Sequence, residues 1–399
     1  ARINPRAESK FLRDAIKAFS ADVVIRTVYA YTGWIDDRRR FLFGNGVIDS
    51  DGWQEGGGAQ LPVRLQQYQL DEAAIQTLPI SQALATFDTL LEVAPPEVII
   101  PLLGALLLPP IAWTIAAPQP MVHLYGITGS HKTALTCAAM ALWGRFAPAQ
   151  PTDTWTSTPN SIQKLGWYLK DTPFLLDDYK AAHVKPAQVT FLLQNYGDGM
   201  ARGRLDANAE ARTAFPIRAT LISSGEDQPE GEASALARIL SVPLARGQVD
   251  RAKLTDVQAN AQSLPVLLVD YLSWLATQPA MLPHNRDRHA KQRAHLLAAL
   301  EAVSDQATNP GRVASNVAAL AIAWHTFGQF LRERGYWREE RVTTWLGLCA
   351  QHLQRLAAAQ VNLVTDERYS VQFFQAVRGL LATGRAQMQN LDLSSGDVA

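Results

Sequence analysis

Cysteine is scarce in this sequence, whose 399 residues include only Cys137 and Cys349. Two cysteines cannot build a disulfide framework or a thiolate metal cluster, so a reducing cytoplasm is the expected compartment. The eight histidines also lack metal-like spacing, and His284, His289 and His295 fall on a charged segment that we expect to be exposed. The sequence therefore argues against a zinc site and against a disulfide-rich secreted fold.

An excess of charge of either sign is absent as well. The 37 Lys and Arg residues balance 37 Asp and Glu residues, which excludes a strongly basic nucleic-acid binder by bulk charge. Any contact with a polyanion must therefore be local. With 47% hydrophobic and 19% charged residues, the composition is that of an ordinary globular protein, long enough for two or three domains.

No uninterrupted apolar run of membrane length is present. Val98 to Ala117 spans 20 residues without a charge, but Pro101, Pro109 and Pro110 interrupt it and no Lys/Arg cluster flanks it. We therefore expect a pair of buried helices and no membrane partner. The first residues do not read as a signal peptide, and without an initial Met the sequence could belong to a longer chain.

A glycine-rich turn at residues 126–133 is the most informative segment. It follows the apolar stretch Val122–Tyr125 and precedes an expected helix, Ala134 to Trp143, which is the context of a phosphate-binding P-loop. Its backbone N–H groups would cradle the phosphates of ATP, Lys132 would reach the β- and γ-phosphates, and Thr133 would ligate Mg²⁺. The residues expected around the nucleotide are Gly126, Thr128, Gly129, Ser130, His131, Lys132 and Thr133.

His131 departs from this pattern, because a P-loop usually has glycine immediately before the lysine. Two interpretations stay open at this position. The histidine marks either a degenerate ATPase or a subfamily in which the side chain points away while the backbone N–H still faces the phosphates.

A second apolar stretch, Pro173 to Asp178, predicts the acidic strand that a nucleoside triphosphatase requires. Its carboxylates come at the carboxyl end, where ligands bind in such sheets. Asp177 would hold Mg²⁺ through water, and Asp178 would orient and deprotonate the attacking water. The alternative is a strand that ends in a solvated turn, which its position after a P-loop disfavours.

A third strand is expected at Ile217–Ser224, where Ser224 could sense the γ-phosphate or the attacking water; the alternative is a serine turn. Ala233 to Leu240 then reads as a helix before a strand at Ser241–Leu244. Arg238, near the helix end, is placed to serve a neighbouring subunit as an arginine finger, or else is a surface arginine.

Three further arginines are candidates for phosphate contacts. Arg202 and Arg204 lie in a glycine-rich segment, residues 197–206, that fits a hairpin gripping single-stranded DNA or a solvated loop. Arg312 begins a helix after Asn309. A cation there opposes the helix dipole unless it binds an anion or an acidic neighbour, so we consider it a lid arginine for the γ-phosphate.

These segments predict an α/β fold: a P-loop, AAA+-like ATPase core with a mixed α+β N-terminal domain and a helical C-terminal region. We expect a helix at Lys10–Ser20, a β-hairpin around the charged turn 36–40, and two short helices around Gly384 that could begin a winged-helix module. Long helices are expected at Leu264–Thr277, His289–Val303, Val313–Gly335 and Val342–Gln360. The expected domains are 1–90 (accessory), 91–118 (apolar connector), 119–250 (ATPase core) and 251–399 (helical lid and C-terminal region).

The ordered set resembles the replicative helicases of phages, plasmids and other mobile elements, which are related to superfamily 3 and AAA+ ATPases. The resemblance rests on HLYGITGSHKTALTCAAMALWG, TSTPNSIQKL, TPFLLDDY, YGDGMARGRLD, LISSGEDQP and ALARIL, with a weaker match at VYAYTGW. Members tolerate a bulky residue where His131 stands, whereas many carry Asn where this sequence has Ser224. The resemblance implies these roles: phosphate and Mg²⁺ binding, Lys132 and Thr133; acidic pair, Asp177 and Asp178; sensor 1, Ser224; finger, Arg238; hairpin, Arg202 and Arg204.

The sequence thus predicts an ATP-hydrolysing, Mg²⁺-dependent, ring-forming helicase or translocase that moves on single-stranded DNA. A homo-hexamer is the expected assembly, with a primase or polymerase as a further partner. Two alternatives stay open: an ATPase that loads or remodels proteins without unwinding, and a degenerate ATPase that serves as an assembly module.

Overall fold

The computed structural model describes residues 27–115, 119–198, 215–278, 281–303 and 308–382, together with Phe11, Asp14, Ala15 and Ala18. Most of the helix expected at 10–20 therefore lies outside the described residues. The same is true of both hairpin arginines, Arg202 and Arg204.

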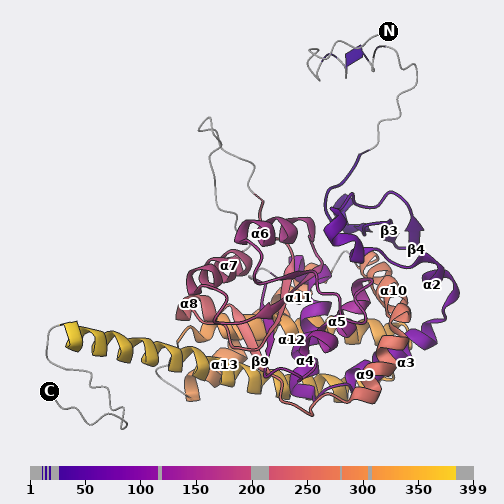
Figure 1. The fold of residues 1–399 in the computed structure, drawn as a ribbon. Coiled ribbons are helices and arrows are strands. Elements are labelled where there is room, and N and C mark those ends of the chain that lie inside the picture. The colour runs from indigo at the N-terminus through magenta and orange to yellow at the C-terminus, as the bar shows by residue number, and fades with distance from the viewer. Residues whose placement is uncertain are drawn as a thin grey trace.

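The N-terminal part forms a four-stranded antiparallel sheet, which contains the expected hairpin (Figure 1). Its first two strands pair across the charged turn, with Gly33 opposite Leu42 and Ile35 opposite Arg40. Phe41 belongs to the main hydrophobic core and Leu42, on the other face of the sheet, to a smaller buried cluster, so both faces of this sheet are covered. The strands are β1 (Gly33–Ile35), β2 (Arg40–Leu42), β3 (Gly46–Asp49) and β4 (Gly52–Glu55).

The central sheet has five strands, all parallel, in the order β6-β7-β8-β5-β9. Because the strands are parallel, the loops that follow them gather at one edge, here called the carboxyl edge. The expected α/β class is confirmed. The strands are β5 (Met121–Tyr125), β6 (Asp153–Thr154), β7 (Pro173–Tyr179), β8 (Thr220–Gly225) and β9 (Ile239–Pro243).

Two strand boundaries differ from the sequence expectation. The strand β8 begins at Thr220 instead of residue 217, and β9 begins at Ile239 instead of residue 241. The pairing of Ile239 with Met121 draws β9 back toward its N-terminus. The helix α8 (Ala233–Leu236) therefore has only four residues, and Arg238 follows it in the turn before β9.

The apolar segment before the P-loop strand forms two buried helical pieces, as expected. All ten residues from Val98 to Leu107 are buried, and the α-helix contacts β5, β8 and β9. No helix among the described residues is long and apolar enough to cross a membrane. These elements are α4 (Pro96–Leu107) and the 3-10 helix η3 (Pro109–Thr114).

Side-chain caps mark where several of the smaller helices begin. Asp71, Thr158 and Asp250 each accept a hydrogen bond from a backbone N–H in the first turn of α2, α6 and α9, respectively. The smaller helices are α2 (Glu72–Thr77), α3 (Ile80–Leu91), α5 (Lys132–Met140), α6 (Pro159–Tyr168), α7 (Pro186–Asp198) and α9 (Arg251–Ala259). Short 3-10 helices are η1 (Asp36–Arg38), η2 (Val63–Tyr68), η4 (Ala141–Trp143) and η5 (Ala261–Ser263).

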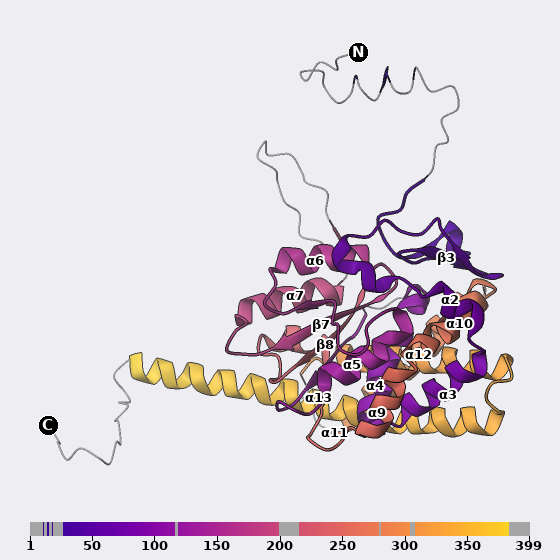
Figure 2. The same cartoon turned by 45° about the vertical axis from the view of Figure 1, so that its right-hand side comes forward.

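The C-terminal part is helical, as expected, with α10 (Leu264–Ala276), α11 (Met281–Val303), α12 (Pro310–Glu333) and α13 (Glu339–Ala382). Two of these helices are longer than their apolar periodicity predicts. The helix α11 begins eight residues before His289, and α13 continues through Tyr369 to Ala382 instead of giving way to a separate helix. Gly384 lies outside the described residues. Figures 1 and 2 both show the distal part of α13 projecting from the body of the molecule.

One hydrophobic core joins these parts. It extends from Phe41 in the N-terminal sheet, through the central sheet, to Val364 in α13. Phe43 stacks on Trp143 with ring centroids 6.0 Å apart, so the N-terminal sheet packs against η4, which directly follows α5. This contact anchors the C-terminal end of the P-loop helix α5, and the N-terminus of α5 faces the carboxyl edge.

Candidate functional site

The predicted P-loop occupies the turn from β5 to α5 at the carboxyl edge. Gly126 begins it where the chain after β9 passes closely: a Cβ on Gly126 would lie 2.1 Å from the Leu244 carbonyl oxygen. Glycine is therefore the residue that fits this contact. Leu244 in turn donates its N–H to the Tyr125 carbonyl at 2.8 Å, which ties the start of the loop to the neighbouring strand.

His131 adopts a left-handed backbone conformation, with φ 64° and ψ 23°, immediately before α5. This explains why glycine is usual at the position, because glycine reaches positive φ without steric cost. The imidazole caps no backbone group of the helix. Its Nε2 is buried and has no hydrogen-bond partner among the described residues.

The ammonium group of Lys132 lies inside the loop. Its Nζ donates to the Gly126 carbonyl at 2.7 Å, to the Ile127 carbonyl at 3.1 Å and to Ser130 Oγ at 3.2 Å. Burial lowers the pKa of Lys132, while Glu226 and Asp177 oppose that shift. The loop therefore surrounds a cation with carbonyl and hydroxyl oxygens, and phosphate oxygens could replace these acceptors.

Asp177 is the centre of the site because it joins two predicted residues. The Thr133 hydroxyl donates to Asp177 Oδ2 at 2.9 Å, and the Ser224 hydroxyl donates to Asp177 Oδ1. The carboxylate is buried. Since β8 lies between β5 and β7, Ser224 comes from the strand that separates the P-loop from the acidic strand.

A β-bulge separates the two neighbouring aspartates. In the β7–β8 ladder, Leu176 pairs with Ser223 and Tyr179 pairs with Gly225, so β7 carries one extra residue. Asp178 in this bulge has a left-handed φ of 59° and a side chain that is 53% exposed. Bulges re-aim side chains, and this one turns Asp178 toward solvent while Asp177 faces Thr133.

A charged cluster that sequence reasoning missed surrounds Asp178. Lys180 Nζ lies 3.5 Å from Asp178 Oδ1 and 3.3 Å from Glu226 Oε1, and Thr128 donates to the same Glu226 oxygen at 2.6 Å. The hydrogen bonds from Thr128 and Lys180 lower the pKa of Glu226, and the bond to Glu226 raises the pKa of Lys180. Lys180 and Glu226 come directly after the last residues of β7 and β8, and this position was the signal that the sequence offered.

Arg246 is a second residue that the sequence analysis missed. It follows β9, and both its Nε and Nη2 donate to the Thr128 carbonyl, at 3.0 and 2.8 Å. The guanidinium also lies 3.5 Å from the point where a Cβ on Gly129 would stand. A cation of the same subunit thus lies directly on the P-loop.

A buried polar chain supports the carboxyl edge from within. Trp155 Nε1 donates to Ser223 Oγ at 2.8 Å, the Ser223 hydroxyl faces His123 Nδ1 at 2.8 Å, and His123 Nε2 lies 3.0 Å from the Asp227 carbonyl. All four groups are satisfied when His123 is neutral and protonated on Nε2. Burial lowers the pKa of His123 to about 4, which agrees with this assignment.

Arg238 and Arg312 lie near the opposite edge of the sheet. The Arg238 carbonyl accepts from the N–H of Met121, the first residue of β5, and its Nη1 donates to the Ser234 carbonyl. Asn316, one turn beyond Arg312 on α12, donates to the Ala237 carbonyl at 3.0 Å. Since the P-loop follows the far end of β5, both arginines lie away from the P-loop of their own chain.

The residues at the carboxyl edge fit Mg²⁺ and a nucleoside triphosphate. Magnesium usually takes one or two protein oxygens and completes its octahedron with water and substrate phosphates. The Thr133 hydroxyl and the Asp177 carboxylate supply two such oxygens at hydrogen-bond distance from each other. Among the described residues no group of three or more His, Cys, Asp or Glu could hold a metal on its own.

Comparison with solved structures shows a shared fold. A structure described as "SCCmec type IV Cch - active helicase" is similar over 97% of this chain and 70% of that chain, with a TM-score of 0.55 and 12% identity. Lower similarity is found to the JCV helicase (TM-score 0.32, 10% identity, 51% of this chain and 60% of that chain). The C-terminal region of NrS-1 is likewise less similar (TM-score 0.33, 12% identity, 83% and 82%). The fold of this chain is thus similar to that of the structure described as an active helicase.

No curated protein has a significantly similar sequence. The family described as "Domain of unknown function (DUF927)" matches residues 2–214, which is more than half of the chain. The match includes the P-loop and β7 and ends before β8. The chain is therefore a member of the DUF927 family.

Proposed function

We propose that this chain is an ATP-hydrolysing DNA helicase or translocase of a mobile-element or phage replication system. The observation that carries the proposal is the meeting of Thr133, Asp177 and Ser224 directly beside Lys132 at the carboxyl edge of a parallel sheet. The similarity of the fold to a structure described as an active helicase supports the same class. Membership of superfamily 3 or the wider AAA+ group is part of this proposal.

Each residue at the carboxyl edge has a role in the proposed hydrolysis. The N–H groups of the P-loop and Lys132 would bind the phosphates, and Thr133 and Asp177 would hold Mg²⁺, whose charge offsets that of the β- and γ-phosphates. Asp178, exposed at its bulge, would accept the proton of the attacking water. Ser224 would keep Asp177 in position through its hydrogen bond.

The proposal includes a ring, with a homo-hexamer as its expected form. Arg238 and Arg312 lie away from the P-loop of their own chain, which is where groups offered to a neighbour belong. Arg238 would then stabilise the charge of the transition state on the adjacent subunit. Arg202 and Arg204 would contact single-stranded DNA in the central channel, and a primase or polymerase would be a further partner.

The site assignment is tested by two substitutions that should differ in their effect on ATP binding. Lys132→Ala should lose ATP binding, since the cation inside the loop disappears, whereas Asp178→Asn should keep ATP affinity and lose hydrolysis. ATP binding is measured by calorimetry, and turnover by phosphate release with and without single-stranded DNA. Lys164→Ala, an exposed lysine on α6, is the matched control and should change neither quantity. If both site variants hydrolysed ATP at the full DNA-stimulated rate, the site assignment would be wrong.

Two alternatives share this core and are separated by activity. An ATPase that loads or remodels other proteins would hydrolyse ATP but would not separate a forked DNA duplex in a strand-displacement assay. A degenerate ATPase serving as an assembly module would show no turnover at all. Retention of both the Lys132–Thr133 pair and the Asp177–Asp178 pair argues against the degenerate form.

A further inference from the structure

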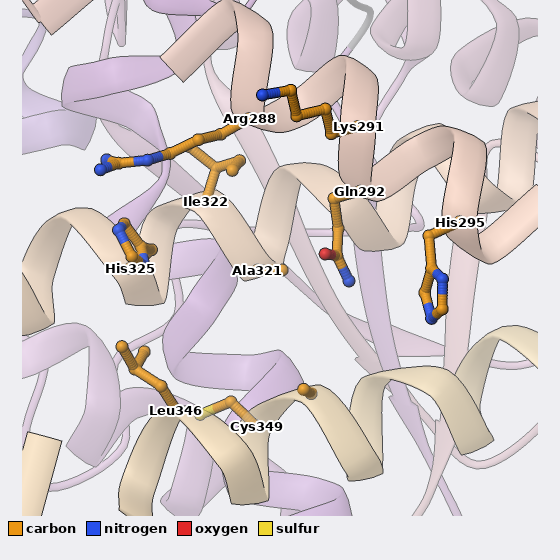
Figure 3. A pocket seen from close by; sticks show the side chains of 10 residues that line it. Arg288, Lys291, Gln292, His295, Ala321, Ile322, His325, Leu346 and Cys349 are labelled. Carbon is orange, nitrogen blue, oxygen red and sulfur yellow. The ribbon is translucent and has the colours of Figure 1, made fainter. Parts of the chain in front are cut away.

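A second site lies in the helical C-terminal part, apart from the P-loop. A cavity of about 480 Å³ opens between α11, α12 and α13, and Figure 3 shows the side chains that line it. From α11, Gln292 and His295 point toward α13, whereas the side chains of Arg288 and Lys291 extend away from α13. The lining residues are Arg288, Lys291, Gln292, His295, Ala321, Ile322, His325, Leu346, Cys349 and Ala350.

The lining of this cavity carries positive charge without a balancing acid. Arg288 and Lys291 contribute full charges, and no Asp or Glu is among the lining residues that the structure describes. Neither cation has a hydrogen bond or an ion pair within the described part of the chain. The pKa of His325 is lowered by burial first and then by the charges of Arg288 and Arg332. In a chain of zero net charge, such a local concentration calls for an anionic ligand.

The basic side chains form a row along α11. His284, Arg288, Lys291 and His295 follow one another at intervals of four, three and four residues, so they share one face of the helix. All four are exposed, and eleven residues of helix cover about 16 Å. A row of that length matches successive phosphates of a chain better than it matches one small anion.

The other wall of the cavity is apolar. Ala321 from α12 and Leu346 from α13 are partly exposed in this wall, whereas Ile322 and Cys349 are almost fully buried. A sugar or an unpaired base could pack on this wall while the phosphates contact the row. A paired duplex would keep its bases inside the helix, so the combination selects a single strand.

We propose that the cavity between α11, α12 and α13 binds single-stranded nucleic acid, with Arg288 and Lys291 contacting backbone phosphates and the apolar wall receiving a sugar or base. The site is independent of the P-loop and of the hairpin arginines of the proposed helicase mechanism. It gives the helical region a direct part in holding the strand.

The proposal is tested with the full chain, without nucleotide, by fluorescence anisotropy of a labelled single-stranded oligonucleotide over a series of salt concentrations. Each phosphate contact to a single strand contributes about 0.7 to the slope of log K against log salt, or about fivefold in affinity at 0.1 M salt. The variants Arg288→Gln and Lys291→Gln should each weaken binding about fivefold. Together they should weaken it about 25-fold and reduce the slope by about 1.4.

The matched control is Arg286→Gln, on the same helix but two residues away and hence on the other side from Arg288. It should bind like the parent protein. An equal loss in the control, or a double variant within twofold of the parent, overturns the proposal. If the Arg288 and Lys291 variants lose binding to a labelled free mononucleotide but bind the oligonucleotide like the parent protein, the proposal is also overturned. The cavity would then be a site for a small nucleotide.

A second measurement does not depend on the stability of a variant. An oligonucleotide carrying 5-bromodeoxyuridine is crosslinked by ultraviolet light to the unsubstituted protein, and the modified peptides are identified by mass spectrometry. Crosslinks to the peptides containing Gln292–His295 or Cys349 are expected. Crosslinks confined to other parts of the chain contradict the site. Because no ATP is used, failure of the proposed ATPase function leaves both measurements unaffected.

Discussion

Replacing His131 with glycine is expected to stabilise the protein while leaving ATP binding intact. His131 has a left-handed backbone, which costs a non-glycine residue roughly 1–2 kcal/mol. Its buried Nε2 lacks a partner among the described residues, and such a group costs about 1 kcal/mol or more. Glycine removes both terms but loses roughly 0.5–1 kcal/mol through its greater backbone entropy in the unfolded chain. The expected net gain in the free energy of unfolding is therefore at least about 1 kcal/mol.

Thermal unfolding monitored by circular dichroism measures this gain, which corresponds to a rise in Tm of roughly 2 °C for a large domain. Asn309→Gly is the matched control, because Asn309 has the same left-handed geometry, with φ 55°, but asparagine tolerates it. The control should gain nothing. If His131→Gly lowered the stability by more than 1 kcal/mol, packing of the imidazole would outweigh strain and the reasoning would fail. A loss of ATP affinity above tenfold would mean that the imidazole itself contacts the nucleotide.

Three further outcomes follow from the geometry. Because burial lowers the pKa of His123 to about 4, below its unfolded value of about 6.5, the unfolded state binds more protons between these values. Stability should fall by roughly 3 kcal/mol as the pH drops through this window, and His123→Gln should flatten the dependence in urea titrations. Gly126→Ala should destabilise the protein by about 1–3 kcal/mol and weaken ATP binding, since its Cβ would meet the Leu244 carbonyl, as melting curves and calorimetry would reveal. Lys180→Ala should leave the stability almost unchanged yet lower kcat about tenfold or more, because Asp178 loses its ionic partner.

Controls for these variants lie within the same chain. Gly347→Ala on α13 meets nothing within 4 Å and should not destabilise the protein, so a loss equal to that of Gly126→Ala would contradict the steric argument. Lys185→Ala, an exposed lysine on the turn before α7, should leave kcat unchanged. An unaltered pH dependence in the His123 variant would assign the acid sensitivity to other groups.

The parallel sheet and the P-loop turn could be predicted because both depend on local patterns. Apolar stretches that lead into Gly126 and into Asp177 identify the carboxyl edge, and parallel strands bring those ends together whatever their order. The roles assigned to the site residues stay predictions. The meeting of Thr133, Asp177 and Ser224 follows from the strand order, which the sequence leaves open.

Features that depend on register or on distant contacts could not be predicted. The bulge that turns Asp178 outward exists only in relation to the pairing with β8. Arg246 reaches Thr128 across 118 positions in the chain, and nothing in its own neighbourhood marks it. The length of α13 was underestimated because apolar periodicity reports packing, whereas the helix continues beyond its packed half.

The helix α13 packs on the body of the molecule along one part of its length and projects from it along the other. Its 44 residues correspond to about 66 Å, and Val364 is the last residue of α13 described as fully buried. The packed half contacts α8 and β9, the elements on either side of Arg238, and the distal part stands clear of the body in both views (Figures 1 and 2). A stiff rod anchored at one end acts as a lever, so a slight tilt near Arg238 becomes a large displacement at Ala382. A pair of fluorophores on the body and on the helix tip would convert movement at that turn into a measurable change in distance.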